Sequence, residues 1–415
     1  MSITHNYVTN APRQSASLPM AARVLFKLLP NLRHGRLTVT LPDRSQHEFG
    51  QDGQGIHAHL DIRDLAICSQ VLTGGDVAFG EGYFNGLWDT TDLPALLTLL
   101  ARNQNELMPA FYGRGWKGWL FRLRHILRAN SRKQAKKNIE AHYDLGNTFY
   151  RVWLDATMTY SSALFERDRD VGLDVAQTAK YERILNEINP PAGGHILEIG
   201  CGWGGFAEHA AKTRGVRVTG ITLSSSQLEY ARERIARAGL QSLVRLELCD
   251  YRDVAKRLGA QFDGVASIEM FEAVGQKYWA SFFKTVQSAL KPGARACVQV
   301  ITIDESRFEQ YAATSDFIQQ YIFPGGMLPS PERFFAGAAQ AKLAVPVKFE
   351  FGQDYAETLR RWLHTFDVAH ETISEQGFSA QFIKLWRFYM AYCIAGFEAG
   401  STNVAQYTLT HQAHD

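Results

Sequence analysis

The strongest constraint on the fold is a glycine-rich segment, Leu197-Glu-Ile-Gly-Cys-Gly-Trp-Gly-Gly205, which continues an apolar strand-like run. Glycine lets the backbone turn tightly and approach a ligand closely. A helix is expected to begin near Phe206, so the segment has the order of strand, glycine loop and helix that α/β nucleotide sites use. A structural turn alone would also explain the glycines.

Apolar strand-like runs alternate with helical text over most of the chain after about residue 134. This alternation indicates a parallel sheet covered by helices on both faces. The order predicts a class I S-adenosylmethionine-dependent methyltransferase fold, a Rossmann-like doubly wound sheet that ends in a late strand pair. The expected strands are 195–199, 216–223, 243–248, 262–268, 294–303, 345–351 and 405–410.

A chain of 415 residues is long enough for two domains. The smaller N-terminal domain is expected to be α+β, with a strand over 36–41, a helix over 93–101, and turns in the glycine- and aromatic-rich stretch Phe79–Trp88. The predicted organisation is a disordered tail (1–20), a lipid-binding or accessory domain (21–112), a basic amphipathic connector (113–137) and the catalytic domain (138–415).

Composition sets limits on the compartment. Apolar residues make up 46% of the chain and charged residues 21%, which is a globular composition. The five cysteines lie far apart without a CxxC pair or a metal-like spacing, which predicts reduced thiols in a cytoplasmic protein and no metal site. No uncharged apolar run approaches the roughly 20 residues that a membrane span needs.

The basic residues are unevenly distributed, although the net charge is only +2. Residues 114–137 contain nine lysines and arginines and no acid, interleaved with Trp116, Trp119 and aliphatic side chains. This composition favours a helix on an anionic membrane surface, at the inner face of the membrane, and a solvated linker helix explains it equally well. Nucleic acid is a weaker partner because no binding motif accompanies the charge. A homodimer is a further expectation.

Residues after the first three strands are candidates for a cofactor pocket. Glu198, two positions before Gly200, favours S-adenosylmethionine over a dinucleotide, and Gly202 and Gly204 belong to the same loop. The stretch Thr222–Gln227 follows the second strand and offers hydroxyls and an amide for the ribose, although Ser224 or Ser225 also suits a helix N-cap. After the third strand, Asp250 is expected to accept the adenine amine and Tyr251 to stack on the ring; an Asp there is also a common turn residue.

Four further motifs make the chain resemble the cyclopropane-fatty-acyl-phospholipid synthase family, to which the mycolic acid cyclopropane synthases belong. They are Glu140–Asn147, Met158–Ser161, Ser267–Gly275 and Tyr321–Pro329. The resemblance covers about residues 75–410, and Gly80–Trp88 is similar to the N-terminal domain of the phospholipid-acting members. It implies transfer of a methyl group from S-adenosylmethionine to the cis double bond of unsaturated phospholipid acyl chains, which forms a cyclopropane.

The resemblance also implies roles for individual residues. Tyr160 and Ser161 would contact the carboxylate end of the cofactor, Glu272 and Tyr355 would hold a bicarbonate ion, and Cys393 would lie near that pocket without being the nucleophile. Such a bound base would avoid placing an enzymic carboxylate where it can be alkylated. The rest of the implied cofactor pocket consists of Gly200, Gly202, Thr222, Leu223, Gln227 and Tyr251.

Methylation of an alkene leaves a carbocation, which requires a dry site rich in aromatic faces. The chain offers bulky aromatics for such a site, although most of them also suit a core. They are Phe165, Phe271, Tyr278, Tyr321, Phe323 and Phe366.

Two positions depart from the family pattern. Ser162 stands where many members have cysteine, a ligand through its backbone carbonyl. Ile301 aligns with a histidine, so that either Gln299, on the same face of the strand, is the donor to the anion or the anion site is built differently. The alternatives are therefore a methylene or methyl-branched product, a methyltransferase of a soluble small molecule, and a catalytically silent lipid-binding protein.

Overall fold

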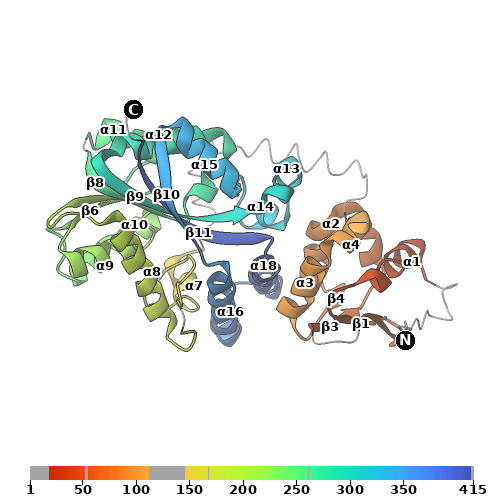
Figure 1. Ribbon diagram of the computed structural model, residues 1–415. Coiled ribbons are helices and arrows are strands. Elements are labelled where there is room, and N and C mark those ends of the chain that lie inside the picture. The colour runs from red at the N-terminus through yellow and green to blue at the C-terminus, as the bar shows by residue number, and fades with distance from the viewer. Residues whose placement is uncertain (1–17, 52–54, 112–144, 167, 260, 413–415) are drawn as a thin grey trace. The chain divides into compact units, whose positions relative to one another are not determined.

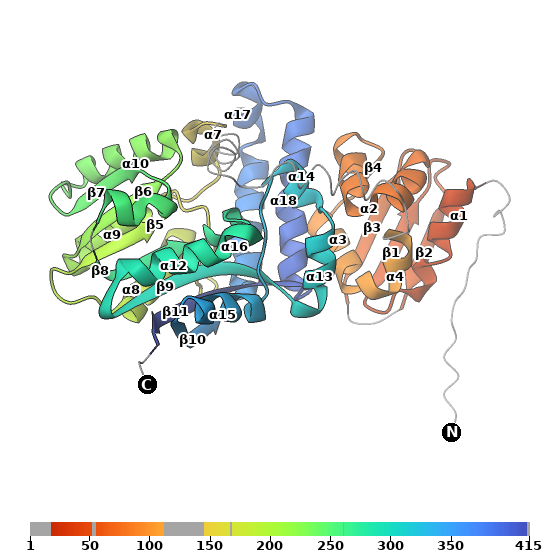
Figure 2. The same ribbon diagram turned by 90° about the horizontal axis from the view of Figure 1, so that it is seen from above.

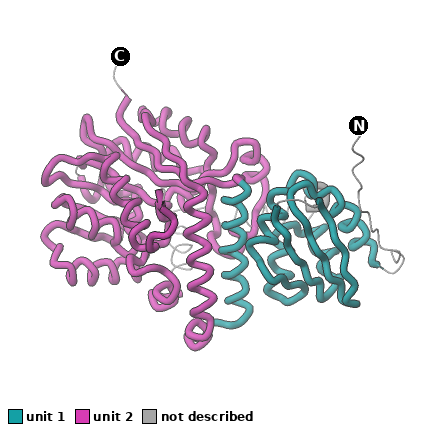
Figure 3. Tube along the Cα trace, turned by 60° about the horizontal axis from the view of Figure 1, so that its bottom comes forward, with its two compact units in different colours: residues 1–121, 378–399 teal, residues 122–377, 400–415 magenta. Residues whose placement is uncertain are grey.

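The computed structural model describes residues 18–51, 55–111, 145–166, 168–259 and 261–412. The chain divides into two compact units, which Figure 3 distinguishes by colour. One unit consists of residues 1–121 together with 378–399, and the other of residues 122–377 together with 400–415. Each unit is described by itself.

The first unit contains a four-stranded sheet in the order β2-β1-β3-β4. Strands β1 and β3 are parallel, and β2 and β4 run antiparallel to their neighbours. The expected strand 36–41 and helix 93–101 are both present. The elements are α1 (Met20–Phe26), β1 (Arg36–Thr40), β2 (Gln46–Gly50), β3 (His57–Ile62), α2 (Ala66–Phe84), β4 (Trp88–Asp89), α3 (Leu93–Arg102), α4 (Gln104–Phe111) and α18 (Ala380–Glu398).

The prediction of turns between Phe79 and Trp88 is wrong for most of that stretch, because α2 continues to Phe84. Phe79 and Tyr83 are one helical turn apart and both pack on Trp88, with ring centroids 4.2 and 5.0 Å away. A Cβ on Gly82 would lie 3.0 Å from the indole of Trp88. The glycine therefore permits close packing of a helix on a tryptophan.

Helix α18 belongs to the first unit, although the sequence-based boundaries place it in the catalytic domain. Its Tyr392 donates a hydrogen bond to Asp76 at 2.8 Å, and Thr98 of α3 donates to Glu398 at 3.0 Å. Phe388 lies 6.4 Å from Trp88, ring to ring. Contacts between residues about 300 positions apart produce this grouping.

The second unit is built on a seven-stranded sheet in the order β10-β11-β9-β8-β5-β6-β7. The strands from β9 to β7 are parallel, and β11 is inserted antiparallel between β9 and β10. The doubly wound sheet with a late strand pair is therefore confirmed. The strands are β5 (His195–Ile199), β6 (Arg217–Thr222), β7 (Val244–Leu248), β8 (Phe262–Ile268), β9 (Leu290–Ile303), β10 (Leu343–Glu350) and β11 (Thr402–His411).

Two layers of helices cover this sheet (Figure 1). Helices α8 (Leu173–Ile188), α9 (Gly205–Arg214) and α10 (Ser225–Arg237) bury one apolar cluster. Helices α11 (Val254–Arg257), α12 (Trp279–Ala289) and α15 (Pro331–Gln340) bury the other. From above, β10 and β11 lie across the unit from β6, β7 and α10 (Figure 2). The other helices are α7 (Asn147–Arg151), α13 (Glu305–Ala313), α14 (Phe317–Tyr321), α16 (Gly352–Val368) and α17 (His370–Glu375).

Two predicted segments lie outside the described residues: the connector 113–137, and the tail 1–20 up to residue 17. Within the described ranges, no helix combines the length and apolarity that crossing a membrane requires. None of the five cysteines, all of which are described, forms a disulfide.

Candidate active site

The glycine-rich loop joins β5 to α9, as predicted. Gly200, Gly202 and Gly204 have left-handed φ angles of +89°, +50° and +81°, a region that favours glycine. Within the part of the chain that the structure describes, a Cβ built on Gly202 would meet no heavy atom within 4 Å, whereas one on Gly200 would lie 2.8 Å from Met270. The loop is therefore open at Gly202 and closed at Gly200 by the segment after β8.

Two buried ionisable side chains from β5 and α8 accompany the loop. Burial raises the pKa of Glu198 to about 8, and no described residue hydrogen-bonds to its Oε2. Burial lowers the pKa of Lys180 to about 7, and its Nζ donates to Ser161 Oγ at 2.6 Å. A buried carboxylate oxygen without a donor is costly, so Glu198 fits a cationic group such as the ammonium of S-adenosylmethionine.

The residues after β6 are organised by the start of α10. Ser224 is the N-cap, and its Oγ accepts from the Gln227 backbone N–H at 3.3 Å. Thr222 Oγ1 donates to Gln227 Oε1 at 3.2 Å, and Leu223 is half-buried. The expected N-cap is therefore present, and cofactor contacts by Thr222, Leu223 and Gln227 stay predictions.

The two residues predicted to meet adenine are already engaged. The Arg252 guanidinium donates to both carboxylate oxygens of Asp250, at 2.8 and 2.5 Å. The Tyr251 ring packs edge-on against Phe282 at 5.8 Å, and burial raises its pKa to about 12. An adenine amine would have to share Asp250 with Arg252.

A second polar group lies where β8 ends. Glu269 follows this strand directly and has a φ of +49°, which is uncommon for a residue with a side chain. Its Oε1 accepts from the Ser162 backbone N–H and from Gln299 Nε2, both at 2.8 Å, and its Oε2 accepts from the Tyr355 hydroxyl at 2.6 Å. Three segments distant in sequence thus donate to one carboxylate.

Glu272 and Tyr355, which were predicted to hold an anion together, have different hydrogen-bond partners. Glu272 Oε1 accepts from the Ile301 backbone N–H at 2.5 Å, and its Oε2 has no hydrogen-bond partner among the described residues. The left-handed turn at Glu269 and the short 3-10 turn Phe271–Ala273 direct the two carboxylates to different partners. Burial and the nearby Glu269 carboxylate raise the pKa of Glu272 to about 8.

Ser162 and Gln299, the residues involved in the two departures from the family pattern, both hydrogen-bond to Glu269. Together with Tyr355 these residues form the Glu269 group. Gln299 Oε1 accepts from Gln406 Nε2 at 3.0 Å, which orients the amide so that its Nε2 faces Glu269. Ser162 contributes its backbone N–H, while its hydroxyl donates to the Ala163 carbonyl at 2.9 Å. Gln299 therefore donates to a side chain of this chain, Glu269, and its predicted donation to a bound anion stays a prediction.

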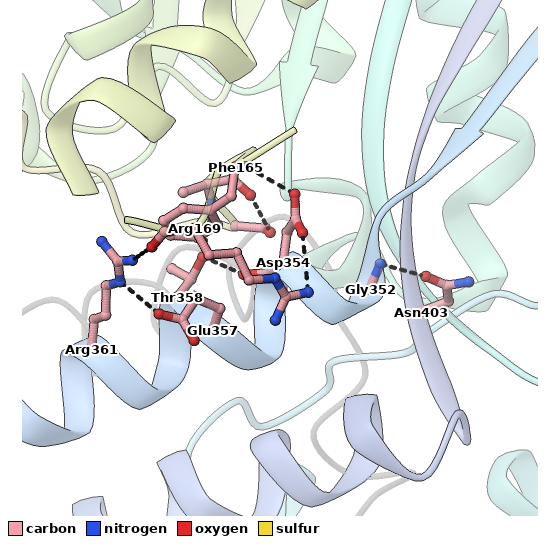
Figure 4. A network of polar contacts seen from close by, with 10 residues as sticks. Phe165, Arg169, Gly352, Asp354, Glu357, Thr358, Arg361 and Asn403 are labelled. Carbon is pink, nitrogen blue, oxygen red and sulfur yellow. Dashed lines mark hydrogen bonds and ion pairs between the residues drawn. The ribbon is translucent and has the colours of Figure 1, made fainter. Parts of the chain in front are cut away.

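Helix α16 fixes the loop that carries Ser162 (Figure 4). Asp354 accepts from the Phe165 backbone N–H at 2.8 Å, and Thr358 accepts from the Ala163 N–H at 3.1 Å. The start of the helix is tied to β11 by the Gly352 N–H, which donates to Asn403 at 2.9 Å. Because α16 also carries Tyr355, this network sets the distance between the hydroxyl of Tyr355 and the N–H of Ser162.

Aromatic rings surround Tyr160. Trp362, Tyr150 and Trp153 lie 5.4, 5.6 and 5.6 Å from it, and Phe323 lies 6.5 Å away, ring to ring. Of these, the sequence-based set included only Phe323. Other members of that set are fully buried in packing, such as Phe271 and Phe366, or are exposed, such as Tyr321.

Sequence reasoning missed Glu269 and Lys180. Glu269 stands in the quoted motif Ser267-Ile-Glu-Met-Phe-Glu272, so the motif held two carboxylates and only the second was assigned. Lys180 gives no local signal, because its neighbours form an ordinary amphipathic helix. Cys393 is half-buried in α18 and belongs to the other unit, so its predicted place near the pocket stays a prediction.

The sheet order and the glycine loop after β5 define the fold of a class I S-adenosylmethionine-dependent methyltransferase. A mycolic acid cyclopropane synthase solved with SAH and CTAB has a TM-score of 0.61 and 28% identity, covering 66% of this chain and 97% of its own. The family model of mycolic acid cyclopropane synthetase matches residues 130–407. The chain belongs to this family.

Two relatives show how far the similarity extends. A tuberculostearic acid methyltransferase of Mycobacterium tuberculosis is 37% identical over 422 aligned residues, which cover 98% of this chain and 94% of that protein. The cyclopropane-fatty-acyl-phospholipid synthase of Escherichia coli K12 is 33% identical over 346, covering 82% and 85%.

Proposed function

We propose that this protein uses S-adenosylmethionine to methylate the double bond of unsaturated acyl chains in phospholipids. The observation that carries the proposal is the open glycine loop at Gly202 together with the half-buried, hydrogen-bonded carboxylate of Glu269, in a chain of this family. The loop, Ser161 and the unpartnered oxygen of Glu198 would hold the cofactor. When bound, the cofactor supplies an electrophilic methyl group.

The aromatic rings around Tyr160 suit the methylation of an alkene. An alkene is a neutral, weak nucleophile, and its methylation places positive charge on carbon. The aromatic faces around Tyr160 stabilise such a charge and exclude water. The names of two relatives, a cyclopropane-fatty-acyl-phospholipid synthase and a tuberculostearic acid methyltransferase, support a lipid chain as the acceptor.

Bicarbonate does not fit this site. Three groups that could hold a small anion, the Tyr355 hydroxyl, the Gln299 amide and the Ser162 N–H, already donate to Glu269. A second anion beside Glu269 would also add like-charge repulsion at a buried position. No step of the proposed reaction therefore runs through bicarbonate.

We place a methylene or methyl-branched product first and a cyclopropane second. One relative that aligns over nearly the whole chain is a tuberculostearic acid methyltransferase by name, and the donors implied for the anion site of cyclopropane synthases bind a side chain here. The resemblance to the cyclopropane synthases keeps the ring product as the second candidate.

The product can be identified by incubating the full-length protein with S-adenosylmethionine and phospholipids that carry a cis double bond. We expect vinylidene or methyl-branch signals, distinct from the vinyl protons of the unreacted cis double bond, in the proton spectrum of the isolated acyl chains, and no upfield cyclopropyl protons. A spectrum with only cyclopropyl protons would support the second candidate. No acyl product, despite tight cofactor binding, would favour a small-molecule methyltransferase or a silent protein and would contradict the proposal.

We further propose that the protein docks on the anionic inner face of the membrane through residues 114–137. Each basic side chain near such a surface contributes about 1 kcal/mol, so replacing Lys133, Lys136 and Lys137 by glutamine should weaken vesicle binding by roughly 100-fold. Sedimentation with phosphatidylglycerol vesicles measures this, and added salt should have a similar effect. Glutamine at the exposed Lys256, Lys277 and Lys284 is the charge-matched control. Salt-independent binding by all variants would contradict this proposal.

A further inference from the structure

We propose that Glu269 is the general base of this reaction: its carboxylate takes the proton that leaves the alkylated acyl chain, in place of a bound anion. This inference rests on the proposed function.

The hydrogen bonds around Glu269 are those that a bound anion would require. Both oxygens are engaged, by a backbone N–H, an amide and a phenol, at 2.6 to 2.8 Å. Two of the three donors are themselves held in place, Gln299 by Gln406 and the Ser162 segment by α16. The structure thus contains a preorganised anion cradle that is filled by a side chain.

The backbone at Glu269 also points to a special role. Its φ of +49° is a left-handed conformation, which carries a cost in a residue with a side chain and is typical of functional sites. The next residue, Met270, lies against Gly200 of the glycine loop. Strands β5 and β8 are neighbours in parallel register, so Glu269 and the loop leave the sheet at the same edge. The carboxylate therefore lies on the side of the sheet where the cofactor is proposed to bind.

The proton balance of the reaction requires such a base. The π electrons of the alkene form the new bond to the methyl carbon, the bond from that carbon to sulfur breaks with its pair left on sulfur, and the second alkene carbon becomes cationic. A C–H bond then breaks. Its electron pair closes a ring when the proton leaves the new methyl directly, or forms a double bond when the proton leaves a neighbouring chain carbon or leaves the methyl after a hydride shift. In each case the proton passes to Glu269, which becomes a neutral acid and returns it to water after product release.

An enzymic carboxylate near an electrophile risks being alkylated, and the hydrogen bonds reduce this risk. Three donors spread its charge and hold both oxygens in place. A carboxylate has about four acceptor positions, so one remains for a proton while three are occupied.

The charged groups around Glu269 keep it ionisable. Burial raises its pKa above the ordinary value, while the Tyr355 hydroxyl, the Lys180 ammonium, the Gln299 amide and the Ser162 N–H oppose that rise. Glu272 is the other acid that interacts with it, and its own raised pKa favours the neutral form. Three hydrogen-bond donors reach Glu269 and one backbone N–H reaches Glu272, so a single negative charge shared by the two carboxyl groups is better stabilised on Glu269.

The test compares two variants of the full-length protein. Glu269→Gln keeps the size of the side chain and removes the base, so turnover should fall by at least about 100-fold while affinity for S-adenosylmethionine changes little. Glu229→Gln, at an exposed site on α10, is the control. Glu269→Gly empties the cradle and suits the left-handed backbone. Added bicarbonate or formate should therefore restore part of its turnover, and 13C-bicarbonate should show line broadening with this variant and not with the parent protein.

The outcomes separate this inference from the proposed function. A parent protein that makes no methylated lipid overturns the proposed function itself. A parent protein that is active but loses activity in bicarbonate-free buffer, and regains it when bicarbonate is added, overturns the role of Glu269. Full turnover by Glu269→Gln also overturns the role of Glu269 as the base. Loss of activity in Glu272→Gln in the same assay would then point to Glu272 instead.

Discussion

Replacing Gly202 by valine should lower the affinity for S-adenosylmethionine by about 100-fold or more. A Cβ at this position meets no atom of the described residues within 4 Å, so the new side chain points into the space where the cofactor is proposed to lie. A loss of this size corresponds to about 2.7 kcal/mol of binding free energy, which is expected when a methyl-bearing side chain excludes part of a ligand. Titration calorimetry with the full-length protein measures it.

Valine at Gly202 also adds backbone strain, because the φ there is +50°. Gly215→Val is the matched control: it lies at the other end of α9, has a φ of +60°, and a Cβ there also meets nothing within 4 Å. Both variants should lose a similar amount of thermal stability, and only Gly202→Val should lose cofactor binding. Normal binding by a folded Gly202→Val protein would show that the cofactor does not lie against this loop.

The parts of the fold that depend on local patterns were predictable from the sequence. Strand β5 has the predicted bounds, because a short apolar run that ends at a glycine loop determines both its type and its end. The helix after the loop begins at Gly205, one residue before the expected position. The glycine and aromatic content of Phe79–Trp88 predicted turns, but helix α2 extends to Phe84 and its Phe79 packs on Trp88.

The Glu269 group shows what local patterns do not contain. Its donors come from positions 162, 299 and 355, and the pairing with Tyr355 joins residues 86 positions apart. The choice between Glu269 and Glu272 depends on a left-handed backbone angle and on how α16 docks. A family motif assigned Glu272 because it transfers a residue by alignment, and alignment does not show that Tyr355 donates its hydrogen bond to the neighbouring Glu269.

Replacing Tyr355 by phenylalanine should lower turnover by about 10- to 100-fold and should move its pH profile. The hydroxyl donates to Glu269 Oε2 at 2.6 Å, and a hydrogen bond to a charged group is worth about 1.5–3 kcal/mol. This bond opposes the rise in the pKa of Glu269 that burial causes, so its removal raises that pKa further. Since the base must be ionised, activity rises with pH through the pKa of Glu269, and the acidic limb of the kcat profile should shift to higher pH in the variant.

Phenylalanine keeps the ring that packs against Trp362 at 6.2 Å, so cofactor affinity and folding should change little. Tyr407→Phe is the matched control, because that buried hydroxyl has no hydrogen-bond partner. An unchanged acidic limb, with turnover lowered equally at every pH, would mean that Tyr355 acts only through packing and that Glu269 does not titrate in the rate-limiting step.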